Sequence, residues 1–122
     1  MTTNNLKQDK TMPKSKQIIP TTEQIQIILD DAPISCSYWA DSFKMRNGVN
    51  YDDFQNPQWE LIVTNDDGET ETMTIDKLKA NWATFVMYSN SRHFCDLVQD
   101  NFDATTVDVA FQIGLFGEVI YG

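Results

Sequence analysis

Histidine chemistry in this chain would have to use one residue, because His93 is the only histidine. A catalytic histidine activates a nucleophile within hydrogen-bond reach, and no serine or cysteine stands at a diagnostic spacing from His93. Cys95 follows two residues later, so on a helix it points to a different face. We therefore expect a structural or exposed histidine and a protein that is not an enzyme.

An oxygen-rich run, Asn65-Asp66-Asp67-Gly68-Glu69, is the candidate for metal binding. A calcium loop alternates its oxygen ligands over about twelve residues and closes with a bidentate glutamate. Here the acids are adjacent, so we expect a solvated hairpin turn and no metal. Carboxylate pairs are available, but their spacing singles out none for glycoside or phosphoester chemistry. The chain has no glycine loop that would cradle a phosphate, and we expect no cofactor.

Polar side chains in the apolar stretch near the C-terminus need either partners or a cleft. Asp103 and Asp108 are explained by helix capping and by complementarity to the helix dipole. Gln112 and Glu118 have no such explanation. They predict either internal hydrogen bonds to Tyr38 or Tyr121, or a small pocket for a nucleotide-like ligand. The residues of that alternative pocket are Tyr38, Trp39, Gln112 and Glu118.

Charge is sorted along the chain. Residues 1–20 carry a net charge of +3, while residues 21–122 hold seventeen acids and five bases, a net charge of -12. The acids gather at Asp30 and Asp31, at Asp52 and Asp53, and from Asp66 to Glu71. If the fold brings these loops together, they form a row of carboxylates that fits a basic groove on another protein. The alternative is a halo of solubilising charge. The same charge disfavours direct binding of nucleic acid by the domain.

Composition predicts a disordered basic arm at residues 1–20 and a single acidic domain at residues 21–122. The domain should begin with a helix capped by Thr21 or Thr22, which Asp30, Asp31 and Pro33 end or break. Aromatic spacing over residues 34–43 indicates a second short helix. Residues 46–57 are rich in turn formers and predict a loop.

Two runs rich in β-branched residues, 59–64 and 70–75, flank the Asp-Gly turn and predict a β-hairpin. Asp76 should cap a following helix whose apolar face holds Leu78, Trp82, Phe85 and Val86. A shorter helix follows, and the last helix, apolar on nearly all sides, should be buried at the centre. The fold class we expect is α+β, with three or more helices packed on a β-hairpin that another strand could extend.

Two cysteines, Cys36 and Cys95, have no CxxC spacing, so we expect reduced, buried thiols in a cytosolic protein. No apolar run approaches the roughly 20 residues that a membrane helix needs. We therefore expect no membrane partner.

The ending Leu115-Phe116-Gly117-Glu118-Val119-Ile120-Tyr121-Gly122 resembles that of small uncharacterised tailed-phage proteins. Their ending commonly reads Leu-Phe-Gly-Glu-x-Val-Tyr-Gly after an Asp-Ala, an Ala-Asp and a Gln. The pair Tyr38-Trp39 is similar to an early Tyr-Trp pair in the same proteins, although the residues before it differ from their glycines. The resemblance implies a phage origin and the cytoplasm of the bacterial host as the place of action. It implies no activity.

Small size, acidity and this resemblance favour a non-enzymatic phage protein that binds and inhibits a host or bacterial-defence protein, one that processes nucleic acid. The expected binding surface consists of Asp30, Asp31, Asp52, Asp53, Asp66, Asp67, Glu69 and Glu71. The alternatives are a small-molecule binding protein and a virion or assembly component. An unpaired hairpin edge also makes a homodimer plausible.

Overall fold

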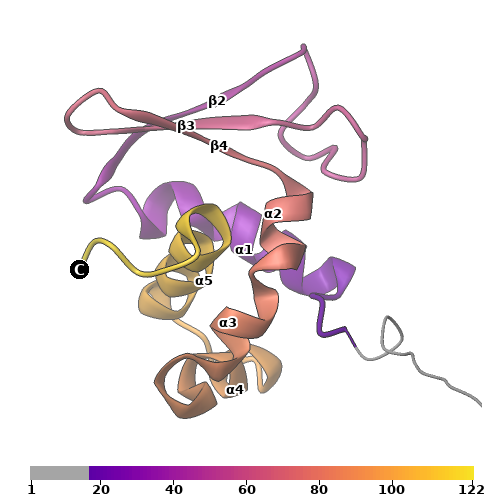
Figure 1. Cartoon of the computed structure of the whole chain (residues 1–122), viewed down its shortest axis with the longest axis vertical. Helices are drawn as coiled ribbons and strands as arrows, with labels where there is room; N and C mark the ends of the chain where they lie inside the picture. Colours follow the sequence, from indigo (N-terminus) through magenta and orange to yellow (C-terminus); the bar gives the residue numbers. More distant parts are fainter. Residues whose placement is uncertain (1–16) are drawn as a thin grey trace, which may run out of the picture.

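A three-stranded antiparallel sheet covers a layer of helices in the computed structural model, which describes residues 17–122 (Figure 1). The predicted arm of residues 1–20 therefore lies outside the described residues except for 17–20, which form no helix or strand. The elements run α1 (Thr22–Ser35), β2 (Ala40–Met45), β3 (Leu61–Asn65), β4 (Thr70–Met73), α2 (Ile75–Ala80), α3 (Trp82–Met87), the 3₁₀ turn η2 (Tyr88–Ser91), α4 (Arg92–Val98) and α5 (Ala104–Phe116). The predicted α+β class is confirmed. Among the described helices, none is both long and apolar enough to cross a membrane.

Helix α5 is the centre of the fold, as its composition predicts. Every residue from Thr106 to Leu115 is buried, because α1, α2, α3, α4 and β4 all contact this helix. Asp103 caps its N-terminus through a capping box with Thr106. Gly117 ends it with φ of 81°, a left-handed conformation that glycine adopts without steric cost.

Helix α1 begins where it was predicted, with Thr21 as its cap, but the predicted stop before Pro33 is wrong. The helix continues through Pro33 to Ser35. Proline has no N–H to donate to the carbonyl four residues earlier, which is that of Leu29. The Tyr51 hydroxyl donates to this carbonyl instead, at 2.5 Å. A side chain from the loop between β2 and β3 thus satisfies the group that the proline leaves free.

The helix predicted over residues 34–43 is wrong, because α1 extends to Ser35 and a turn then leads into strand β2. Pairing with β3 decides the conformation: Phe43 lies opposite Val63, and Met45 lies opposite Leu61. Phe43 packs beneath the sheet against Phe111 of α5, with ring centroids 5.4 Å apart. Strand β2 is the additional strand that the hairpin was expected to gain.

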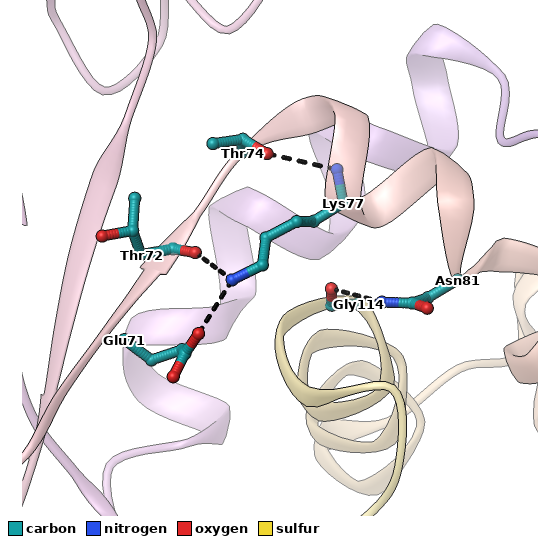
Figure 2. A network of polar contacts seen from close by, with 6 residues as sticks. All are labelled: Glu71, Thr72, Thr74, Lys77, Asn81 and Gly114. Carbon is teal, nitrogen blue, oxygen red and sulfur yellow. Dashed lines mark hydrogen bonds and ion pairs between the residues drawn. The ribbon is translucent and has the colours of Figure 1, made fainter.

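The β3–β4 hairpin is confirmed, with Gly68 at φ of 84° in its turn. The helix after it differs from the prediction. Thr74 caps it in place of Asp76, by accepting a hydrogen bond from the backbone of Lys77. The chain then breaks at Asn81 into α2 and α3, and the Asn81 amide donates to the Gly114 carbonyl of α5 at 3.0 Å (Figure 2).

Candidate functional site

A buried carboxylate links the two ends of the folded chain. Asp108 of α5 is 7% exposed and accepts hydrogen bonds from the Tyr38 hydroxyl at 2.5 Å, the Trp39 indole N–H at 2.9 Å and the Gln112 amide at 2.9 Å. The predicted explanation of Asp108 by the helix dipole is therefore wrong. Three donors stabilise this carboxylate in place of a cation.

Gln112 holds the C-terminal residues against α5. Its side-chain oxygen accepts from the backbone N–H groups of Ile120 and Tyr121, both at 2.8 Å. Its amide nitrogen donates to Asp108 and, at 3.1 Å, to the Tyr121 carbonyl. The predicted internal hydrogen bonding of Gln112 is confirmed. These bonds leave its amide no free position for a ligand, and Glu118 is exposed, so the four-residue alternative pocket is not assembled.

Aromatic rings also hold the C-terminal residues against the rest of the fold. Tyr121 stacks on Trp39, with centroids 4.7 Å apart and planes 5° apart, and Phe116 packs against both rings. Asn65, at the end of β3, donates to the Tyr121 hydroxyl at 3.1 Å. The C-terminal segment, residues 118–122, is thereby fixed between α5 and the hairpin.

Two adjoining hollows lie on either side of Tyr121. The hairpin hollow, of about 440 Å³, is lined by Trp39, Val63, Asn65, Glu69, Thr70, Glu71, Leu115, Phe116, Ile120 and Tyr121. The tail hollow, of about 470 Å³, is lined by Tyr38, Trp39, Asn65, Asp66, Asp67, Tyr121 and Gly122. Four of the predicted surface acids and both predicted aromatic residues therefore border one continuous region.

The remaining predicted acids lie elsewhere. Asp52 and Asp53 belong to the loop between β2 and β3, and in an antiparallel meander this loop and the β3–β4 turn are at opposite ends of the sheet (Figure 1). The two ends are separated by the five residues of β3, about 17 Å at roughly 3.4 Å per residue. The acids therefore do not form a single row.

Asp30 and Asp52 instead both act electrostatically on Tyr51. Burial raises the pKa of the Tyr51 hydroxyl above its ordinary range, and the charges of both carboxylates raise it further. Asp31 lines a third, smaller hollow with Ile34 and Phe102. None of these acids lines either hollow beside Tyr121, a separation from the hairpin acids that the sequence does not indicate.

The other residues considered for chemistry have no catalytic arrangement among the described residues. His93 is 5% exposed and packs against Tyr88, and its Nδ1 has no partner within residues 17–122. Cys36 is buried as predicted, and burial together with Asp108 raises the pKa of its thiol, which keeps it protonated. Cys95 is exposed, contrary to the prediction. No group of three or more histidine, cysteine or acidic side chains within residues 17–122 could hold a metal ion.

Tyr38 is a hydrogen-bond donor over the whole physiological range. Desolvation of its hydroxyl, and then the bond to Asp108, raise the pKa of Tyr38 to about 12. Its ring, in contrast, is exposed and forms one wall of the tail hollow.

Sequence reasoning did not assign Asn65 or Tyr121 to a binding surface, although both residues line both hollows. Tyr121 was expected only as a hydrogen-bond partner of Gln112, and Asn65 only as a residue of the hairpin turn. The comparisons with known proteins add no relative: no family model, no curated protein and no solved structure matches this chain.

Proposed function

We propose that this chain is a non-enzymatic phage protein that binds a basic groove of a host or bacterial-defence protein, one that processes nucleic acid, and blocks that groove. The observation that carries the proposal is the position of four exposed carboxylates beside an apolar hollow. These acids are Asp66, Asp67, Glu69 and Glu71. The resemblance of the C-terminal ending supports the phage origin.

The charge of the hairpin end supports this role. Within residues 17–122 the ion pairs join Arg46 to Glu60 and Lys77 to Glu71, so only one of the four hairpin acids is paired. Exposed carboxylates of one sign steer a basic partner toward the surface and make association sensitive to salt. A groove evolved for the phosphates of DNA or RNA has the complementary charge.

The hollows supply apolar contact surface, which charge alone does not. Affinity and register at protein interfaces depend on aromatic and apolar groups that are removed from water. Phe116 and Tyr121, which are partly exposed, provide such groups next to the acids, and the buried Trp39 supports Tyr121 by stacking. Their positions are fixed by stacking and by the bonds of Gln112, so binding requires little ordering of this surface.

The proposal is tested with a tagged pull-down from bacterial lysate at low and at high salt. One variant carries Asp66→Asn, Asp67→Asn, Glu69→Gln and Glu71→Gln. A matched control removes the same number of charges elsewhere, by Asp30→Asn, Asp31→Asn, Asp52→Asn and Asp53→Asn. We expect the native chain and the control to capture one nucleic-acid-processing protein at low salt, and the hairpin variant to lose it.

The captured protein is then assayed on its own nucleic acid with increasing amounts of the native chain. Inhibition that the hairpin variant lacks supports the proposal. Equal capture by both variants, or capture without inhibition, contradicts it.

A small-molecule binding protein is the second candidate, because both hollows fall within the usual range of about 300–1,000 Å³ for ligand sites. A ligand that co-purifies with the native chain and with the hairpin variant alike would favour this candidate. A chain that brings down only itself would favour an assembly component.

A further inference from the structure

We propose that the hairpin hollow receives an arginine side chain of the partner as the anchor of the complex. This inference rests on the proposed function and names the group that the site selects. The hollow combines apolar walls with carboxylates at one side, which matches a side chain that has an apolar stem and a cationic end.

The position of Glu71 is the first argument. Glu71 lies opposite Val63 in the β3–β4 register, so the two side chains share one face of the sheet. Val63 is buried on the inner face, toward α5. A carboxylate therefore sits at the end of an otherwise apolar face, directly beside the hollow, and Glu69 lies next to it at the turn.

The aromatic walls favour arginine over lysine. Phe116 and Tyr121 are partly exposed where they line the hollow, and a planar guanidinium stacks on aromatic faces more readily than an ammonium does. Its forked N–H groups also suit two neighbouring carboxylates, which Glu69 and Glu71 supply. An ammonium offers neither planar stacking nor a fork.

Lys77 shows that the Glu71 carboxylate accepts a cation. Its ammonium donates to Glu71 at 2.9 Å and to the Thr72 carbonyl of β4 at 2.5 Å (Figure 2). Strand β4 is an edge of the sheet, and the lysine occupies a carbonyl that an added strand would otherwise use. The partner is therefore expected to insert a side chain and to share Glu71 with Lys77, and not to add a strand to β4.

The test uses three blocked pentapeptides of glycine and serine that differ only at the centre, which is arginine, lysine or uncharged citrulline. Each is titrated into the ¹⁵N-labelled full chain at low salt and followed by NMR. We expect the arginine peptide to shift the amide signals of Val63, Glu71 and Tyr121, and to bind at least threefold more tightly than the lysine peptide. The citrulline peptide should cause no shift.

Variants of the chain should change the affinity for the arginine peptide in opposite directions. Glu69→Gln with Glu71→Gln should weaken arginine binding at least tenfold, whereas the matched control Asp52→Asn with Asp53→Asn should leave it within twofold. Lys77→Gln should strengthen it about threefold, because the internal competitor for Glu71 is removed. A gain of binding cannot arise from a damaged fold.

The failures of the two proposals are distinguishable. Equal binding of the arginine and lysine peptides, or shifts confined to Asp66 and Asp67, overturns the arginine anchor. A second outcome also overturns the anchor while the proposed function stands. In that outcome, the partner is no longer captured by Asp66→Asn with Asp67→Asn but is still captured by Glu69→Gln with Glu71→Gln. Capture that no hairpin acid affects overturns the proposed function itself.

Discussion

Replacing Gln112 by leucine should separate the C-terminal segment from α5 and destabilise the whole domain. Leucine fits the apolar helix and has a similar size, so the substitution tests the hydrogen bonds of the amide. Gln112 makes four bonds of 2.8–3.1 Å, three to the backbone of residues 120 and 121 and one to Asp108. Its side chain is fully buried.

The magnitude follows from these contacts. The three bonds to backbone groups contribute about 1 kcal/mol each, and the bond to the Asp108 carboxylate contributes about 1.5 kcal/mol. The additional apolar burial of leucine offsets about 1.5 kcal/mol. We therefore expect the free energy of unfolding to fall by about 3 kcal/mol, a large part of the 5–15 kcal/mol typical of a domain.

Urea denaturation followed by tryptophan fluorescence measures this change, and amide hydrogen exchange reports on the segment itself. We expect the amides of Ile120 and Tyr121 to lose their protection in Gln112→Leu. The matched control is Tyr121→Phe, which keeps the stack on Trp39 and removes only the bond from Asn65. Its cost should be about 1 kcal/mol or less. A loss below about 1 kcal/mol in Gln112→Leu, with both amides still protected, would refute the reasoning.

Three further predictions concern stability. Tyr51→Phe should cost about 1–2 kcal/mol in urea denaturation, because the α1 carbonyl opposite Pro33 loses its donor, and Pro33→Ala should remove most of that cost; equal costs in both backgrounds would contradict this account. Backbone and side-chain bonds from Thr106 lower the pKa of Asp103. The charged carboxylate therefore stabilises the fold at pH values above its ordinary pKa near 3.8, and this contribution is lost as the pH falls below that value. Asp103→Ala should therefore cost about 1 kcal/mol at pH 7 and less at pH 2, whereas a cost independent of pH would exclude the capping charge as its cause. Gly114→Ala should lower stability by about 1–3 kcal/mol in thermal unfolding, because a Cβ would lie 2.6 Å from Cδ1 of the buried Leu78, and unchanged stability would show that the Leu78 side chain can move aside.

Signals that are local in sequence predicted their elements well. The capping residues Thr21 and Asp103, the Asp-Gly turn and the apolar surface of the last helix each act within a few residues. The segment from residue 34 to residue 43 failed because its aromatic spacing suits a helix, whereas pairing with β3 decides the outcome. The prediction that the helix ends at Pro33 failed for a similar reason, because the donor that compensates for the proline, Tyr51, lies in a distant loop.

The candidate site was only partly predictable. Polar residues on an apolar helix indicated that Gln112 needs partners, and Tyr121 was one of those expected. Nothing in the sequence indicated that the hairpin acids would border an aromatic hollow, because that depends on how residues 118–122 return across Trp39. The meander likewise separates acid clusters that look equivalent along the chain.

The pair Tyr38-Trp39 and the C-terminal residues 118–122 meet in the structure. Tyr38 and Trp39 donate to Asp108, and the C-terminal ending places Tyr121 on Trp39. Both segments therefore belong to the network that positions the hollows. Asp66, Asp67 and Glu71 take no part in that network, whereas Glu69 accepts a hydrogen bond from Asn65, which also donates to the Tyr121 hydroxyl. Substitution of Asp66, Asp67 or Glu71 should therefore leave the network that fixes residues 118–122 intact.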